Sequence, residues 1–325
     1  MEWREKLNNY WKDGKWEEAI ALLSRQLRNR NLTSREKAEI LINRALITRI
    51  FISPRKALEI LQSSPLTEII KTSRSNELKG YYLWAVGTTH RFAGNISEAL
   101  KLVRKSLRIF NRYRKGKHAG KGYALCALGG INRISGNFLQ SLSYYEQASF
   151  FFEKYYPEDY YSIAYSKCGI GNAYRMLGEF EIAKHFLIQA NDLYKKIDEK
   201  IARGYTLWSL ALINILQNLI DTAIEINNEA RKLFEATRDT RGIVYTILNS
   251  IQINAISGKD STEFINDGFC LCDKYGHTFE RTYLIILSST LNNEWKVLKT
   301  SIKILKKMGV ASLPWLSKSL PLNLP

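Results

Sequence analysis

Apolar residues recur along most of the chain at spacings of three and four, the period of an α-helix with one buried face. The clearest example is the stretch 122–152. Its first half has apolar residues at Leu125, Leu128, Ile131 and Ile134, and its second half at Phe138, Leu142, Tyr145, Ala148 and Phe152. Between the halves, Gly136 suits a helix end, and Asn137 with Gln140 is typical of a capped helix start. This pattern predicts two helices joined by a tight turn.

Two glycines interrupt the first helix of this hairpin. Gly129 and Gly130 lie in its middle, where each glycine costs about 1 kcal/mol relative to alanine. We therefore expect another element to approach the helix closely at this point.

The same hairpin recurs at a nearly constant period. The turn position is occupied in succession by Gly14, Ile52, Gly94, Gly136, Gly178, Asn218 and Gly258, at spacings of 38, 42, 42, 42, 40 and 40 residues. An alanine of the second helix recurs in step at Ala19, Ala57, Ala99, Ala183 and Ala223, with Ser141 in its place once. A period of this length predicts a stacked array of repeats.

Two motifs carry a family resemblance: GNAYRMLGEFEIAKHFLIQA (Gly171–Ala190) and DGKWEEAIALL (Asp13–Leu23). Both resemble the tetratricopeptide repeat (TPR), although these units exceed the usual length of about 34 residues. The chain is similar in this respect to the long-unit arrays of kinesin light chains and of bacterial regulator and sensor proteins. The resemblance covers roughly Trp3 to Lys274. It implies an all-α, right-handed α-solenoid of about seven TPR helix pairs with a C-terminal helix pair and a capping tail.

We expect one solenoid over residues 1–311, because stacked repeats contact only their neighbours and do not divide into separate cores. The predicted units lie near 3–28, 35–62, 77–110, 122–152, 161–195, 201–236 and 241–274, followed by a divergent pair at 279–307. Pro65 is expected to stop a helix, and the link 63–76 to be partly irregular. The proline-rich apolar tail, 312–325, is interpreted as a strap over the last repeat or as a short docking peptide.

The chain shows no pattern typical of export or of membrane insertion. Its N-terminal stretch is charged, and no window reaches 18 apolar residues. The four cysteines form no disulfide framework. We expect a cytoplasmic protein with reduced thiols.

Charge is concentrated at one end of the chain. The net charge is +17, and residues 1–121 hold 26 Lys and Arg against 11 Asp and Glu. A basic patch is predicted from one helix face and the loop after it: Lys101, Arg104, Lys105, Arg108, Arg112, Arg114, Lys115, Lys117 and Lys121. Such a patch attracts nucleic acid or another polyanion. The alternative is an ordinary solvated outer face.

Two ladders recur on the first helices of the units. Arginines follow each other at 42 residues from Arg49 to Arg175, and tyrosines at 42 or 40 from Tyr81 to Tyr245. In TPR proteins this stripe lines the concave groove and grips a peptide. The resemblance therefore implies a partner-binding groove formed by Tyr81, Trp84, Arg91, Tyr123, Arg133, Tyr165, Asn172, Arg175, Tyr205 and Trp208. The alternative is that these side chains only pack the repeats together.

Signals for catalysis or for a bound ion are weak. The histidines lie in separate units, and neither a phosphate-binding loop nor a nucleophile with its base is found. Cys270 and Cys272 with His277 could hold a metal in principle, but a helix face accounts for them better. We predict no catalytic residue, no metal and no cofactor.

The sequence thus predicts a non-enzymatic scaffold or adaptor that binds a protein or peptide, with acidic or C-terminal carboxylate character, in its concave groove. One alternative is a nucleic-acid- or polyanion-associated subunit that uses the basic patch. Another is a sensor or regulator subunit of a larger complex. The oligomeric state stays open.

Overall fold

The structure, a computed structural model, describes residues 2–310 and 319–325. Over these residues it contains helices and no strand, which confirms the all-α prediction. The helices are α1 (Glu2–Lys12), α2 (Trp16–Leu27), α3 (Ser34–Phe51), α4 (Pro54–Leu61), α5 (Ser64–Thr72), α6 (Asn76–Phe92), α7 (Ile96–Arg112), η1 (Tyr113–Gly116), α8 (Gly120–Ile134), α9 (Phe138–Tyr155), α10 (Tyr160–Leu177), α11 (Phe180–Lys196), α12 (Lys200–Leu216), α13 (Ile220–Ala236), α14 (Thr240–Ile256), α15 (Thr262–Tyr275), α16 (Thr278–Leu291) and α17 (Trp295–Lys307).

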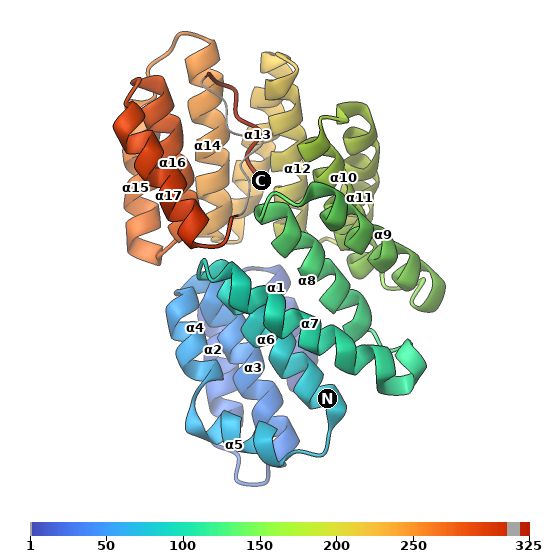
Figure 1. Cartoon of the computed structure of the whole chain (residues 1–325). Helices are drawn as coiled ribbons and strands as arrows, with labels where there is room; N and C mark the ends of the chain where they lie inside the picture. The colour runs from blue at the N-terminus through green and yellow to red at the C-terminus, as the bar shows by residue number, and fades with distance from the viewer. Residues whose placement is uncertain (1, 311–318) are drawn as a thin grey trace.

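Successive helices form hairpins that stack side by side into a curved array (Figure 1). Each first helix, such as α8, α10 or α12, packs against its own partner and against the first helices of the neighbouring hairpins. The first helices are buried on most sides, whereas the second helices keep an exposed polar face. This division agrees with the sequence, where the first helices are the less polar of each pair.

The tight turns use the left-handed backbone that glycine favours. The φ angle is +83° at Gly136 and +86° at Gly178, and Asn218 takes +60° at the equivalent position. Ile52 is the exception, with φ −114°. The turn there is completed by Ser53, whose side chain caps α4.

The proline at position 65 marks a helix boundary on both sides. Helix α4 ends before it, at Leu61, as expected, and Pro65 lies in the first turn of α5, where the missing N–H costs no hydrogen bond, so the link 63–76 is largely helical. Asn137 makes no side-chain cap, because the turn holds it at ψ 66° instead of the extended conformation. Thr33, at ψ 155°, forms a capping box with Glu36.

The two glycines in the middle of α8 each leave room for a different neighbouring side chain. A Cβ built on Gly129 would lie 2.7 Å from the ring of Tyr145 on α9. A Cβ on Gly130 would lie 2.4 Å from Nη1 of Arg91, which comes from the preceding hairpin. The expected close approach is therefore made by side chains that reach the α8 backbone.

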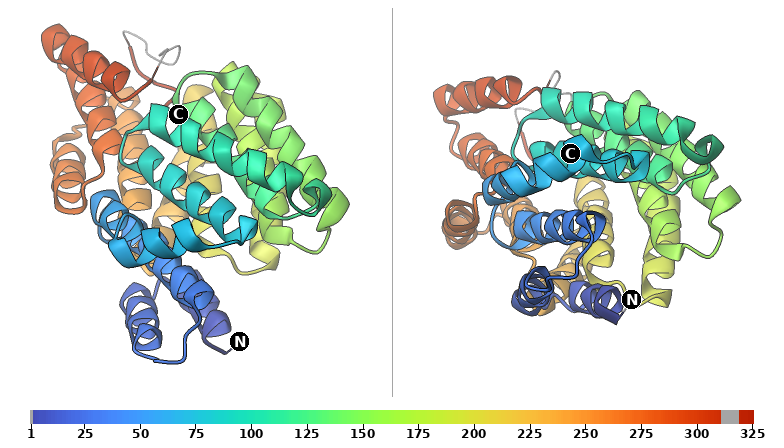
Figure 2. Two further views of the ribbon diagram at one scale, coloured as in Figure 1. Left: turned by 60° about the horizontal axis from the view of Figure 1, so that its bottom comes forward. Right: turned by 90° about the horizontal axis from the view of Figure 1, so that it is seen from below.

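The array curls until its first hairpin meets the loop after α13 and the start of α7 meets the end of α17, which the sequence did not indicate. Nε1 of Trp16 donates to the carbonyl oxygen of Thr237 at 2.9 Å, across 221 positions of the chain. At a second contact, the amide of Ile96 donates to the carbonyl oxygen of Met308 at 3.2 Å. Figure 2 shows the N-terminal helices beside α12 and α13 as a result. The inner face is thereby walled on several sides instead of forming an open groove.

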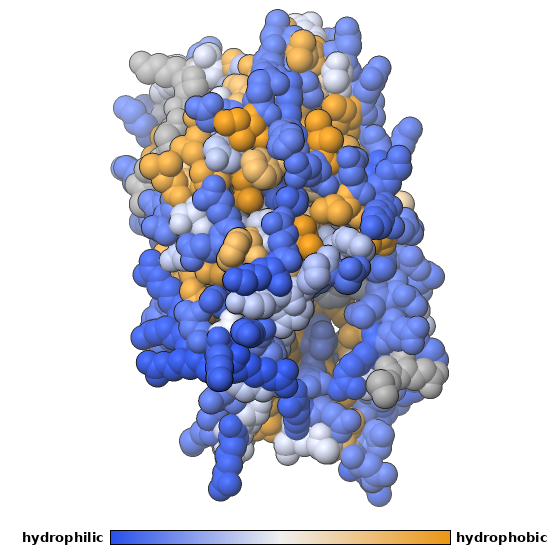
Figure 3. Space-filling view, turned by 90° about the vertical axis from the view of Figure 1, so that its right-hand side faces the viewer, coloured by the Kyte–Doolittle hydropathy of each residue, from blue (hydrophilic) through white to orange (hydrophobic). Residues whose placement is uncertain are grey.

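The outer surface is mostly hydrophilic, with apolar side chains gathered in the upper part of the face seen in Figure 3. Leu139 and Phe150 of α9 and Ile188 of α11 are more than half exposed. None of the helices among the described residues has the length and apolar character to cross a membrane. Of the predicted tail, 312–325, the part up to Lys318 lies outside the described residues, and 319–325 lies against the inner face rather than over the last repeat.

Candidate functional site

A cavity of about 790 Å³ lies on the inner face of the array. Its walls come mainly from the first helices α1, α3, α6, α8, α10, α12, α14 and α16, each of which contributes one or more turns. The size is typical of a site for a small molecule or a short peptide segment. The first helices stack along this space, and the contact of the first hairpin with the loop after α13 closes it.

Most of the side chains predicted for the groove do line this cavity. They are Trp84, Arg91, Tyr123, Arg133, Tyr165, Asn172, Tyr205 and Trp208. Two do not: Tyr81 lies at a separate hollow of about 260 Å³, and Arg175 is fully buried beneath the C-terminal residues. The predicted set is thus brought together except for these two residues.

Tyr81 belongs to a packing cluster, as the alternative interpretation of the tyrosine ladder proposed. Its ring meets Phe110 and His118 edge to face, with centroids 5.3 and 5.7 Å away. Burial raises the pKa of its hydroxyl well above the usual range.

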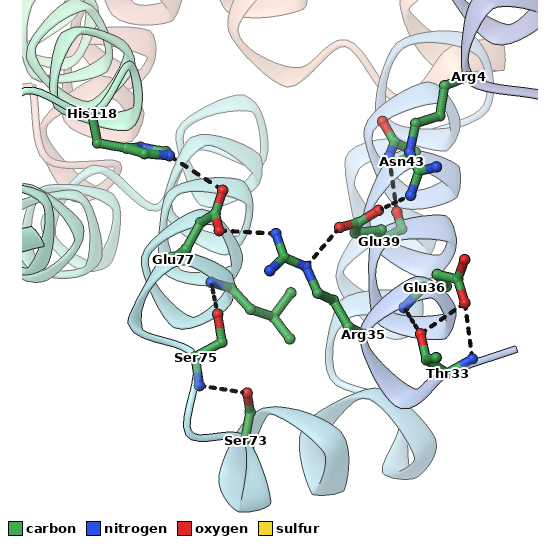
Figure 4. A network of polar contacts seen from close by, with 11 residues as sticks. Arg4, Thr33, Arg35, Glu36, Glu39, Asn43, Ser73, Ser75, Glu77 and His118 are labelled. Carbon is green, nitrogen blue, oxygen red and sulfur yellow. Dashed lines mark hydrogen bonds and ion pairs between the residues drawn. The ribbon is translucent and has the colours of Figure 1, made fainter. Parts of the chain in front are cut away.

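Beside Tyr81, a chain of polar contacts joins several hairpins (Figure 4). Arg35 bonds Glu39 at 3.1 Å and Glu77 at 2.9 Å, and Glu77 also meets His118 at 3.2 Å. Because these side chains come from α3, α6 and the loop before α8, the network ties these elements together beside the smaller hollow and not at the cavity.

Three guanidinium groups surround one aromatic ring at the cavity wall. The Cζ atoms of Arg49, Arg91 and Arg241 lie 4.4, 4.8 and 4.7 Å from the centroid of Phe92. Each such contact is attractive, because the face of the ring is electronegative. The ring thereby holds together three like charges that would otherwise move apart.

Within this wall, Arg49, Arg91 and Arg133 have no carboxylate partner among residues 2–310 and 319–325. Nε of Arg49 and both Nε and Nη1 of Arg133 are buried without a hydrogen-bond partner in the described structure. Burial, reinforced by the charge of Arg91, lowers the pKa of Arg49 to about 9. Arg49 keeps one bond, from Nη1 to the hydroxyl of Thr88 at 2.9 Å. The wall therefore offers several N–H donors that an anionic ligand would satisfy.

Three acidic residues of the cavity wall are engaged in local structure, and a fourth, Glu5, is exposed. Asp239 accepts a bond from the amide of Gly242 at the start of α14, and Glu199 one from Ala202 at the start of α12. Glu280 pairs with Arg241 at 2.6 Å. Although burial alone would raise the pKa of Glu280, the charge of Arg241 holds it below the ordinary value. These carboxylates do not neutralise the remaining arginines.

Replacing Arg133 with methionine is expected to raise the free energy of unfolding by about 1 kcal/mol, measured by urea denaturation. The reason is that the wild-type side chain buries two N–H groups whose lost hydration is not compensated. Arg241→Met is the matched control, because it leaves Glu280 buried alone and should destabilise the protein. A loss of stability in both variants would contradict the interpretation of Arg133 as an unsatisfied donor.

Sequence reasoning missed some of the residues that shape the site. Phe92, Arg241 and Glu280 belong to neither ladder. Arg49 and Tyr245 are ladder members, but they were not part of the predicted groove. Arg241 lies one helical turn before Tyr245 and donates to its hydroxyl at 3.2 Å. No periodic signal marks these residues, because their partners come from other repeats.

The predicted basic patch lies on α7, η1 and the start of α8, on the outer surface and away from the cavity. All its members except the half-buried Lys121 are exposed. Lys101 pairs with Glu98 at 3.2 Å, and Lys117 lies over the ring of Tyr155. The patch and the cavity are therefore separate surfaces that can be tested separately.

The described residues contain no group of three or more His, Cys, Asp or Glu side chains that could hold a metal. Cys270 is exposed and Cys272 is buried, so the two thiols point to different surroundings. His277 contacts the hydroxyl of Thr240 at 3.0 Å.

Comparison with known proteins agrees with the repeat pattern. Residues 81–154 match the model of the tetratricopeptide repeat family. No curated protein sequence matches the chain. The array resembles a Rap protein complexed with competence and sporulation factor, with a TM-score of 0.69 and 15% identity over 95% of this chain and 88% of that one.

Two further structures resemble the array. The Rap conjugation gene regulator of plasmid pLS20 in complex with the Phr* peptide gives a TM-score of 0.61, at 13% identity over 94% of this chain and 93% of that one. Aspartyl phosphate phosphatase F from Bacillus subtilis gives 0.56, at 15% identity over 94% and 83%. At these identities the likeness shows the fold alone, and it confirms the expected solenoid.

Proposed function

We propose that this chain of tetratricopeptide repeats is a non-enzymatic binding protein whose cavity holds a peptide or protein segment that carries a carboxylate. The observation that supports this most directly is the buried, unpaired set of N–H donors on Arg49 and Arg133. A buried arginine without an acceptor costs stability, and a carboxylate bound there would recover that cost.

The shape and lining of the cavity fit a peptide better than a single anion. Its volume of about 790 Å³ is several times what one carboxylate needs. The aromatic side chains of Trp84, Tyr123, Tyr165 and Trp208 offer apolar surface next to the arginines. Rigid aromatic anchors beside charged donors are typical of binding hot spots. Peptide binding is also consistent with the regulator of plasmid pLS20, a protein of this fold in complex with the Phr* peptide.

The test is binding of a panel of short fluorescent peptides, each with either a free or an amidated C-terminus, measured by fluorescence polarisation. We expect the free acids to bind more tightly. The double variant Arg49→Met, Arg133→Met should weaken their binding by about 100-fold or more, because each charged hydrogen bond contributes about 1.5–3 kcal/mol. The amidated peptides should be affected much less.

The matched control is Arg104→Glu with Arg108→Glu on the exposed face of α7. This pair changes the charge of the protein more than the cavity variant does, and it should leave peptide binding unchanged. Equal affinity of the cavity variant and the wild type for every free acid would overturn the proposal.

Polyanion binding at the basic patch is the second candidate, because five of its side chains form an exposed row on α7: Lys101, Arg104, Lys105, Arg108 and Arg112. Its affinity should fall steeply as salt is raised, by counterion release. The Arg104→Glu, Arg108→Glu protein then serves as the loss-of-binding variant and the cavity variant as the control. The same two proteins therefore separate the two candidates.

A further inference from the structure

The last residues of the chain occupy part of the inner face. Figure 1 shows them at the centre of the molecule, near α10, α12 and α14. Leu322 and Leu324 are fully buried and join the main hydrophobic core, and the side chain of Asn323 between them bonds Arg175. The backbone amide of Leu324 donates to the carbonyl oxygen of Leu322 at 3.0 Å, so the segment makes a γ-turn at Asn323 that buries both leucines.

Hydrogen bonds from α10 and α14 hold both the backbone of this segment and the side chain of Asn323. The amide of Leu322 donates to Oε1 of Gln252 on α14 at 2.5 Å. Nη1 of Arg175 on α10 donates to the carbonyl oxygen of Leu324 at 2.9 Å and also to Oδ1 of Asn323. The side-chain Nδ2 of Asn323 in turn donates to the carbonyl oxygen of Arg175 at 2.8 Å. Arg175 thus recognises Asn323 through both its guanidinium and its main chain.

The recognising side chain is positioned by residues outside the segment. Oδ1 of Asn172 accepts from Nε and Nη2 of Arg175 at 3.3 and 3.1 Å, and Asn172 is itself held by the hydroxyl of Ser209 at 2.8 Å. The guanidinium lies over the ring of Trp208. Nη1 bonds the segment, while Nε and Nη2 are fixed by Asn172, so contacts outside the segment set the direction of the guanidinium. A preorganised donor of this kind raises affinity by reducing the entropy cost of binding.

We propose that Arg175, Gln252 and the apolar surface between them form a second peptide-binding site, selective for a Leu-Asn-Leu segment that turns at its asparagine. The C-terminal residues of this chain are its resident ligand, bound in cis. A peptide of the same chemistry, added in trans, competes with them. Because the resident segment is covalently part of the chain, its effective concentration at the site is high. It therefore fills the site unless a substitution weakens its binding.

The site also touches the large cavity, since Pro325 lies on the cavity wall. A peptide in the cavity would then meet the end of the resident segment. This consequence rests on the function proposed above, whereas binding of a detached segment to its own site does not. The two ideas can therefore fail independently.

The experiment uses the full-length chain with Leu322→Asp and Leu324→Asp, which places two charges in the core position and releases the segment. The probe is a fluorescent peptide of sequence SLPLNLP, corresponding to residues 319–325. We expect it to bind this variant at least tenfold more tightly than the wild type, whose site is already filled. Addition of Arg175→Met to the variant should abolish the gain.

Two controls keep the result interpretable. Peptide SLPDNDP, with both leucines exchanged for aspartate, should bind neither protein. If circular dichroism shows that the double aspartate variant is poorly folded, Asn323→Ala replaces it. This variant keeps both leucines and loses only the hydrogen bonds of the Asn323 side chain to Arg175, so it should give an intermediate gain in affinity. Equal binding of SLPLNLP to the wild type and to a folded releasing variant would overturn the proposal, as would a gain that survives Arg175→Met.

The outcome can be told apart from a failure of the cavity proposal. SLPLNLP binding is measured without any cavity ligand. The single variant Arg49→Met, which leaves unchanged the charge of Arg133 that acts on Arg175, should leave this binding within about twofold of its value in the releasing variant. If the free-acid peptides also bind, their affinity should rise when the segment is released. Binding of SLPLNLP without any effect on the free-acid peptides would retain the second site and reject the coupling to the cavity.

Discussion

Replacing Trp16 with alanine is expected to lower the free energy of unfolding by about 3–5 kcal/mol, the usual cost of truncating a large buried aromatic side chain. Trp16 is fully buried and bonds the carbonyl oxygen of Thr237. The turn before it is equally close, since a Cβ on Gly14 would lie 2.2 Å from that same oxygen. Loss of the indole should therefore separate the first hairpin from the loop after α13 and open the cavity.

Urea denaturation measures the first effect and small-angle X-ray scattering the second, as an increased radius of gyration. Trp16→Phe is the matched control, because it keeps most of the packing and loses only the hydrogen bond, at a cost of about 1 kcal/mol. An alanine variant with wild-type stability and an unchanged radius would show that the contact between the two ends of the array does not hold it closed.

The second large effect is expected at the buried ion pair between α14 and α16. Glu280→Gln should cost about 3 kcal/mol, because it leaves the guanidinium of Arg241 without its charged partner. The carboxylate is almost fully buried, so solvent screens the interaction little. The double variant Arg241→Met, Glu280→Met removes both charges and should recover most of the loss.

This ion pair also predicts a pH dependence with a definite sign. Arg241 holds the pKa of Glu280 below its ordinary value, so its contribution is present above pH 4.5 and is lost as the pH falls further. His277, whose burial lowers its pKa to about 4, adds its own loss on acidification, and the charge of Glu280 raises that pKa. The two proteins are therefore compared with His277→Gln in both. Between pH 5 and pH 3 the wild type should therefore lose more stability than Glu280→Gln. Parallel pH profiles would contradict this assignment.

Much of the inner wall could be predicted because neighbouring repeats place equivalent residues on the same face. Spacing placed Trp84, Tyr123 and Arg133 on the same stripe of the first helices, and the family resemblance implied that this stripe faces inward. All three do line the cavity. Their role as a binding surface stays a prediction until peptide binding is measured. Arg175 lies on the same ladder but outside the cavity, because the chain's own C-terminal residues cover it.

Features that join distant repeats could not be predicted. The pair of Arg241 with Glu280 spans 39 positions, and the contact of Trp16 with Thr237 spans 221. Neither has a periodic signature, since each occurs once. The same holds for Phe92, which gathers three arginines from three different helices.

The sequence by itself determined the helical hairpin, its repetition at about 40 residues and the stripe of aromatic and arginine side chains on the first helices. These are local properties, decided by helical periodicity and turn chemistry within each unit. Only the tertiary structure decided that the array closes on itself and that its arginines are left unpaired. The small rotation between successive repeats accumulates over the whole array, so where its ends meet depends on every interface together and on no single stretch of sequence.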